Sequence, residues 1–200
     1  MAVTMDNPPM PGPSSYPVRL DVQYPEKLNN LLPLVKWLLA IPHFIIVYAL
    51  LIVVEVITVI AFFAILFTTK YPEGLFKFAV GVLRWQANVS AYLYLLRDEY
   101  PPFSMDAGQY PVTLEIDPPD QLNRWLPLVK WLLAIPHFVV LIFLSIAVYL
   151  TTVIAFFSIL FTGKYPEGLF KFAVGVSRYG QRVNCYLLLM TDAYPPFSLD

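Results

Sequence analysis

The sequence is poor in the side chains from which most active sites are built. Only 14% of its 200 residues are Asp, Glu, Lys or Arg, two are His and one is Cys, whereas soluble domains carry about 25% charged residues. The single Cys185 excludes an intrachain disulfide framework and a thiolate metal cage. The sequence also lacks a Gly-rich phosphate loop, a nucleophile elbow, paired catalytic carboxylates and a closely spaced His/Cys set. We therefore expect no enzyme, no metal site and no resident cofactor.

The chain also lacks an excess of positive or negative charge. The formal net charge is −1 and the Lys and Arg residues are scattered, which makes nucleic-acid binding unfavourable. The first thirty residues are polar and Pro-rich without a basic segment followed by an apolar one, so we expect no cleavable signal peptide. Residues 1–15 are too poor in apolar side chains to fold alone and are predicted to be a disordered tail.

Apolar residues are abundant instead. They make up 58% of the chain, against about 45–50% in ordinary globular domains. Such a composition requires a non-aqueous solvent, and we predict an integral membrane protein.

The chain is a tandem repeat. Residues 16–106 align with residues 110–200 at an offset of 94 without a gap, and 58 of the 91 aligned positions are identical. The longest shared strings are LPLVKWLLAIPHF, TVIAFF, KYPEGLFKFAVGV and YPPFS. The two copies are therefore predicted to be two membrane domains of the same fold.

Each repeat opens with a short extended segment, YPVRLDV or YPVTLEI, whose alternating pattern predicts a half-buried strand that pairs with its copy. Residues 28–41 are predicted to form an interfacial helix with Lys36 and Trp37 at headgroup level, ending before Pro42. Residues 44–67 and 138–161 then each provide a predominantly apolar stretch of 24 residues, long enough to cross a bilayer, with Glu55 as the one ionisable group.

The last helix of each repeat, over residues 75–97 in the first, decides the topology. It is apolar but carries a polar stripe of Lys77, Arg84 and Asn88, matched by Lys171, Arg178 and Arg182. The stripe fits either an interfacial helix or a span with a protein-covered polar face. Because near-identical units should share one orientation, we predict an all-α membrane protein of two tandem helical hairpins. It has four spans, short extended segments, and Pro-rich loops on one face. Two spans with two interfacial helices, and a monotopic arrangement, remain open.

A few polar side chains are candidates for a site. Glu55 lies in the middle of the first span, and its repeat mate is Tyr149, so we predict an ion pair of Glu55 with Arg182 across the repeats or a protonated Glu55 bonded to Thr152. His43 and His137 occupy matched positions that would allow a haem or pigment to bind between them, or both cap helices at the interface. The cations predicted to contact lipid headgroups, anions or a partner are Lys77, Arg84, Lys171, Arg178 and Arg182; for the arginines, bonds to backbone carbonyls are the alternative.

The strings KWLLAIPHF, YPEGLFKFAVGVLRW and AYLYLLRDEYPPF, with their second copies, resemble an uncharacterised family of small prokaryotic membrane proteins, a domain of unknown function that is often duplicated. In that family a second Arg follows the Arg-aromatic pair one turn later; Arg182 fits this place, whereas Asn88 departs from it. The resemblance implies a membrane location, for which we expect the prokaryotic inner membrane with cytoplasmic termini. It implies no activity.

The sequence thus favours a non-catalytic accessory, scaffold or self-assembling subunit of a larger membrane complex, in contact with lipids, other subunits or itself. Two alternatives stay open. One is a transport or lipid- and anion-binding protein that uses the cationic stripe, and the other is a pigment or haem protein that uses the two histidines.

Overall fold

The computed structural model describes residues 16–200. The predicted N-terminal tail, residues 1–15, lies outside the described residues. Each repeat contributes one strand, a short helical entry, one long helix and one shorter helix. The elements are β1 (Val18–Val22), η1 (Leu32–Leu34), α1 (Lys36–Leu39), α2 (Ile41–Thr68), α3 (Glu73–Leu93), β2 (Val112–Ile116), α4 (Leu126–Leu133), α5 (Ile135–Thr162) and α6 (Glu167–Leu187).

The two strands pair with each other, as the sequence predicts, and the structure shows that the pair is antiparallel. The register pairs Val18 with Ile116, Arg19 with Glu115, Leu20 with Leu114, Asp21 with Thr113 and Val22 with Val112. Alternate side chains of both strands are buried on one face, because successive side chains of a strand point to opposite sides. The strand pair therefore has one face on the core and one open face.

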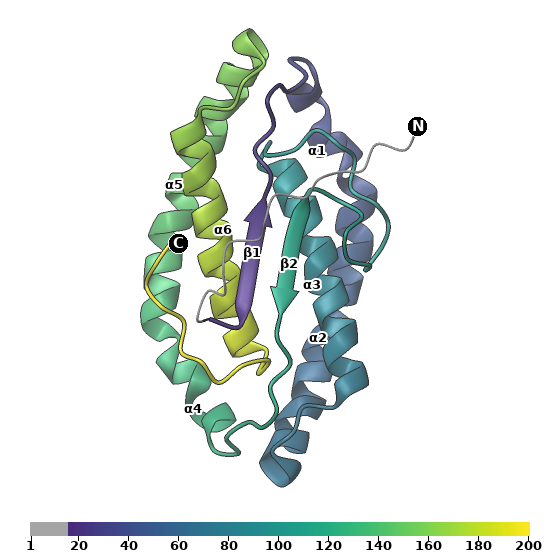
Figure 1. The fold of residues 1–200 in the computed structure, drawn as a ribbon, viewed down its shortest axis with the longest axis vertical. Helices are drawn as coiled ribbons and strands as arrows, with labels where there is room; N and C mark the ends of the chain where they lie inside the picture. The colour runs from purple at the N-terminus through teal and green to yellow at the C-terminus, as the bar shows by residue number, and fades with distance from the viewer. Residues whose placement is uncertain (1–15) are drawn as a thin grey trace.

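This register gives the molecule an internal twofold axis. Leu20 and Leu114 are equivalent residues of the two repeats, and they are paired with each other at the centre of the ladder. An antiparallel pair with this property has its twofold axis perpendicular to the sheet, between the two central residues. The repeats consequently run in opposite directions, and Figure 1, a view onto the sheet, shows α2 leading away from α1 while α5 leads away from α4 at the other end.

The repeats exchange their strands. β1 packs on α6 of the second repeat, and β2 packs on α3 of the first, whereas α2 pairs with α3 and α5 with α6 within each repeat. The connections interlock too. The Leu28 amide donates to the Gly163 carbonyl and the Leu122 amide to the Thr69 carbonyl, both at 2.8 Å. Neither repeat buries its own strand, so the two form one folding unit.

The long helices lie at the edge of the structure and the shorter ones at its centre. On α2 the buried residues are His43, Val47, Val54, Ile57, Ala61 and Ile65. Spacings of three, four and seven residues place them in a single stripe against α3, and most of the remaining surface of α2 is exposed and apolar. By contrast, most residues of α3 and α6 are buried or half-buried. The core therefore lies between the strand pair and α3 with α6.

Several predictions are changed by this architecture. The helix breaks before Pro42 as predicted, but the expected helix over residues 28–41 is only η1 and α1. Among the described residues two helices, α2 and α5, are long and apolar enough to cross a membrane, where four spans were predicted. The sequence predicts that the two repeats have the same orientation across the bilayer. For helices that stand upright in a bilayer this prediction is wrong, because α2 and α5 are antiparallel.

Candidate functional site

A buried lysine anchors the entry of each repeat. Lys36 and Lys130 are each 1% exposed. The Lys36 ammonium lies 2.8 Å from Asp98, donates to the Arg97 carbonyl at 2.6 Å, and sits 4.9 Å from the centre of the Tyr92 ring. This anchor ties the start of the repeat to the segment that leaves α3. The expectation that Lys36 reaches lipid headgroups is wrong.

The second repeat builds the same anchor. Lys130 lies 2.9 Å from Asp192 and donates to the Thr191 carbonyl at 2.7 Å. Burial lowers the pKa of both lysines, and the hydrogen bond that each ammonium donates to the neighbouring carboxylate opposes this shift. Each ammonium has a carboxylate, a carbonyl and an aromatic face around it. Such saturation is typical of a structural ion pair.

The two histidines occupy aromatic boxes. The Trp85 indole N–H donates to Nδ1 of His43 at 3.1 Å, and the His43 ring stacks on Phe103 with 4.0 Å between centroids. In the second repeat Tyr179 takes the place of Trp85 beside His137. Both histidines are fully buried. Because an indole can only donate, the neutral His43 ring carries its proton on Nε2.

The histidines do not meet. His43 lies at the start of α2, and the hydrogen bond from Leu122 to Thr69 brings the entry of the second repeat to the far end of that helix. At about 1.5 Å per residue, α2 rises about 38 Å over this distance. Residues 16–200 also contain no cluster of three or more His, Cys, Asp or Glu side chains suited to a metal. The hypothesis of one haem or pigment between two imidazoles is therefore wrong for this fold.

The matched arginines bind the strands and the C-terminal segments of the two repeats. The Arg178 guanidinium donates to the Leu20 carbonyl at 2.8 Å and to the Leu199 carbonyl at 3.0 Å. Arg84 donates to the equivalent carbonyls, of Met105 at 2.9 Å and of Leu114 at 3.5 Å. Each arginine thus fastens the other repeat's strand to its own helix. These contacts favour the alternative of backbone carbonyl bonds over a free anion site.

Glu55 and Arg182 are not brought together. Arg182 is buried, donates to the carbonyls of Ser198 and Asp200, and lies over the Tyr16 ring. Glu55 is exposed on α2. No salt bridge or hydrogen bond of Glu55 to another residue of the range 16–200 is formed, so the predicted ion pair is absent from this part of the chain.

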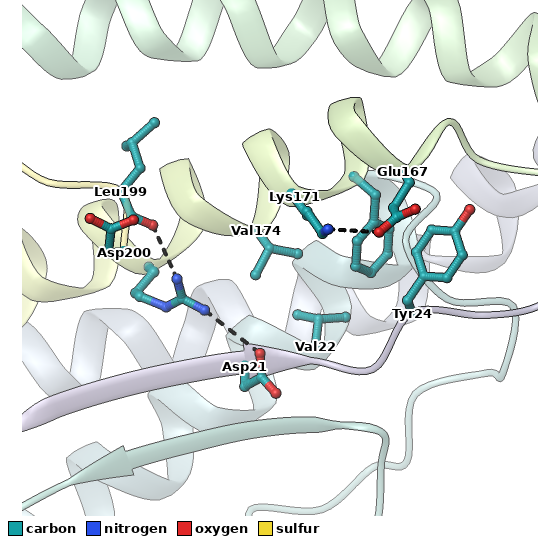
Figure 2. Close-up of a pocket in the computed structure, with 10 residues that line it drawn as sticks. Asp21, Val22, Tyr24, Glu167, Lys171, Val174, Leu199 and Asp200 are labelled. Atoms are coloured by element: carbon teal, nitrogen blue, oxygen red, sulfur yellow. Dashed lines mark hydrogen bonds and ion pairs between the residues drawn. The ribbon is translucent and has the colours of Figure 1, made fainter. Parts of the chain in front are cut away.

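The remaining cations of the stripe are compensated. Lys77 pairs with Glu73 and Lys171 with Glu167, one helical turn away in each case. A hollow of about 370 Å³ lies beside Lys171 (Figure 2). At this hollow the Arg178 guanidinium lies 3.6 Å from the Asp21 carboxylate. Three carboxylates line this hollow, namely Asp21, Glu167 and Asp200, against two cations. It does not form the cationic groove that an anionic headgroup would need.

The lysine anchors were missed by the sequence analysis, although a signal existed. A lysine in the middle of LPLVKWLL and an aspartate before the string YPPF recur in both repeats. An ionisable group retained in an apolar string points to a buried partner. The two groups lie 62 positions apart in the sequence, so their pairing becomes visible only when α2 and α3 fold back on each other.

The geometry of two interlocked copies agrees with the family comparison. The model of the Domain of unknown function (DUF4389) matches residues 33–105 and again residues 125–198. The chain belongs to this family. The DUF4389 unit thus ends within the last structured segment of each repeat and excludes β1, while β2 lies between the two matched ranges. No curated protein matches the chain. No solved structure matches it either.

Proposed function

We propose that this protein is a non-catalytic membrane-embedded subunit that anchors a polar platform to one leaflet and assembles with further subunits. The observation that carries the proposal is the division of the molecule into two unlike broad faces. One is built by α1, α2, α4 and α5, and the other by the strand pair with the segments around it.

The helical face is suited to lipid. Large apolar side chains exposed by 40% or more follow α2 and α5 along their whole length, including Ile45, Ile52, Val59, Phe67, Val139, Phe143, Ile146 and Phe161. Only about a fifth of each helix is buried, unlike the core helix of a soluble protein. Contiguous apolar surface of this extent marks a membrane or protein interface. Trp37, Trp125 and Trp131 are also exposed, as in the aromatic belts of membrane proteins.

The strand face is suited to water. Both strands are edge strands, and unpaired backbone groups on an edge cost several kcal/mol each in hydrocarbon. The outer face also carries the ion pairs of Arg19 with Glu115 and Asp117. If α2 and α5 stood upright in a bilayer, these charges would lie near its centre. We therefore propose that α2 and α5 lie in the membrane plane, with the internal twofold axis along the membrane normal.

This placement is also consistent with the high sequence identity of the two repeats. With the twofold axis along the membrane normal, both repeats meet the same depth of lipid on one side and the same water on the other. Near-identical helices then have identical surroundings although they run antiparallel. The integral membrane location remains part of the proposal, in a monotopic form rather than with four spans.

A structural role fits the saturation of the charged groups. The arginines bind backbone carbonyls, and the buried lysines have carboxylate partners. Glu55 differs from these groups, since it is exposed on an otherwise uncharged helix. A carboxyl in this setting favours contact with a polar group of a second copy of the chain. Assembly into a larger membrane complex is therefore the role that we propose.

Cysteine labelling tests the placement. Cys185 is fully buried, so single cysteines can be added without removing it. Lys70 and Lys164 follow α2 and α5 at opposite ends of the molecule, and Thr113 is exposed on the strand face. In sealed vesicles we expect a membrane-impermeant maleimide to label K70C, K164C and T113C from the same side. Labelling of K70C and K164C from opposite sides would establish two spans and overturn the placement.

Native mass spectrometry of the protein released in lipid nanodiscs tests the assembly. We expect more than one copy per particle, and fewer when Glu55 is replaced by Leu. Particles that hold one copy with and without the substitution would contradict self-assembly. A Glu55→Gln variant keeps the hydrogen-bonding capacity and is the matched control.

A further inference from the structure

A groove with an unusual lining runs along α3, α5 and α6. Its volume is about 690 Å³, within the range of small-molecule sites. The lining residues are Gln86, Ser90 and Tyr94 of α3 and its C-terminal cap, Phe138, Leu141, Ile142, Ser145 and Val148 of α5, and Val176, Ser177, Gly180, Gln181 and Asn184 of α6. We call it the amide groove.

The amide groove opens on the side opposite to the strands. On α3, Arg84 points to β2, while Gln86 and Ser90 lie about 120–160° around the helix from it at 100° per residue. The groove is thus separate from the charged hollow beside Asp21. With α2 and α5 in the membrane, it would open toward lipid.

The polar part of the lining is uncharged. The walls from α3 and α6 provide carboxamides and hydroxyls, and the wall from α5 is apolar apart from Ser145. None of the lining residues is Asp, Glu, Lys, Arg or His. A charged ligand would lose its hydration there without gaining a counter-charge, at high cost. The groove therefore selects a neutral molecule with one polar and one apolar side.

The two repeats differ where they line this groove. Ser145, Ser177 and Gln181 stand where the first repeat has Leu51, Leu83 and Ala87, and Gly180 stands where it has Gln86. Three changes toward polar groups and one toward a smaller residue thus converge on one groove. Within a duplication that is identical at most positions, this clustering indicates that one side has acquired a task of its own.

The carboxamides and hydroxyls of the amide groove can both donate and accept hydrogen bonds. The carboxamide oxygens of Gln86 and Gln181 are buried without a hydrogen-bond donor among the described residues. The hydroxyls of Ser145 and Ser177 donate to the carbonyls of Ile142 and Ala173 in their own helices, which leaves their lone pairs free. Unsatisfied buried acceptors cost about 1–3 kcal/mol each. A ligand that donates hydrogen bonds to these oxygens, with the carboxamides turned toward the groove, would remove this cost.

We propose that the amide groove binds a neutral amphiphile with a hydroxyl-bearing head, of the acylglycerol class. The hydroxyls donate to Gln86 and Gln181, and the acyl chain lies along Phe138, Leu141 and Ile142 of α5. The assignment rests on the lining of the groove and does not depend on the orientation of α2 and α5 in the membrane. It also differs from the anionic headgroup site that the cationic stripe suggested.

Photo-crosslinking of the full chain tests the proposal. The protein is placed in phosphatidylcholine nanodiscs, whose lipid head has no hydroxyl, with a monoacylglycerol that carries a diazirine in its acyl chain. Its 2,3-di-O-methyl ether keeps the shape but has no donor and is the matched probe. We expect crosslinks on α5 and α6 at the groove, competition by unlabelled monooleoylglycerol, and at least about fivefold weaker labelling by the ether, the equivalent of one neutral hydrogen bond.

Variants taken from the first repeat provide a second measurement. Gln181→Ala and Ser177→Leu introduce residues that the same fold already holds at the equivalent positions, and we expect them to weaken groove labelling about fivefold or more. Ser158→Ala, on α5 outside the groove, should leave labelling unchanged. Equal labelling by both probes, or crosslinks spread along the lipid face of α2, would overturn the proposal. The proposal would also be overturned if the crosslinks showed that a protein segment, rather than the lipid, occupies the amide groove.

Discussion

At the scale of single residues, the structural work is done by buried charges in pairs. The Lys36 and Lys130 anchors are built from the same four elements of chemistry, an ammonium, a carboxylate, a carbonyl and a ring. Removing one member of a buried ion pair is strongly destabilising, because the other member stays desolvated without a counter-charge. The exposed pair of Lys77 with Glu73 has no such constraint. The two kinds of pair should therefore respond very differently to mutation.

Replacement of Lys36 by Met should lower the free energy of unfolding by about 3 kcal/mol, since Asp98 loses its counter-charge at a largely buried site. Lys130→Met should do the same through Asp192. Lys77→Met is the matched control and should cause no measurable change. Denaturant titration in detergent micelles would check this, and equal effects of Lys36→Met and Lys77→Met would contradict it.

Alkaline pH should unfold the protein through buried phenols. Burial raises the pKa of Tyr71 and of Tyr165 to about 12, while the unfolded chain has values near 10. Between these values the folded state binds more protons than the unfolded state, so stability is intact below pH 10 and falls as the pH rises toward 12. The pH profile of the unfolding midpoint should flatten in a Tyr71→Phe, Tyr165→Phe double variant. A profile unchanged by this substitution would argue against burial of the phenols.

At the scale of elements, the two long helices end in the same way with different residues. Thr69 and Gly163 both have positive φ, 61° and 67°, directly after α2 and α5. This left-handed cap suits Gly and strains a residue with a β-carbon. The duplication thus contains its own comparison of a strained and a relaxed helix end.

Thr69→Gly should raise the free energy of unfolding by about 1 kcal/mol, because the strain at the cap is relieved. Gly163→Thr should lower it by more than that. A β-carbon at residue 163 would approach the Leu28 carbonyl oxygen and Oδ1 of Asn30 at 3.2 Å each. Thermal unfolding of both variants against the parent protein checks the signs. If Thr69→Gly lowered the free energy of unfolding, the threonine hydroxyl would contribute more to stability than the relief of backbone strain.

Sequence patterns predicted the elements better than their partners. The repeat, the two strands, the break before Pro42 and the long apolar helices all follow from local periodicity and from Pro. The exchange of β1 and β2 between repeats does not, because an alternating strand pattern says which face is buried and not on which helix. For the same reason the roles of Lys36, Arg84 and Arg178 required the structure: their partners lie far away along the chain or in the other repeat.

At the scale of the whole molecule, the two broad faces should differ in their tolerance of charged substitutions. The helical face is apolar over both repeats, and the strand face carries ion pairs. A membrane on the helical face would make that face sensitive to charge, whereas water on the strand face would not.

Phe143, which is 69% exposed on α5, provides the test. Phe143→Arg should weaken retention of the protein in carbonate-washed membranes, since a cation at depth costs about 2.5–3.5 kcal/mol. Thr113→Arg, on the strand face, should be retained like the parent. Equal retention of both variants would contradict contact between α5 and hydrocarbon.

The twofold axis between Leu20 and Leu114 also has a meaning for the origin of the chain. Two separate copies of a single repeat, related by the same axis, would form a closed symmetric dimer in which each copy lends its strand to the other. Such a dimer would form only at protein concentrations above its dissociation constant, so its amount would depend on the expression level. Joining the copies through residues 107–109 makes the second encounter intramolecular, so the tandem gene converts a concentration-dependent assembly into a property of one polypeptide. It also frees the two halves to diverge, as the amide groove illustrates.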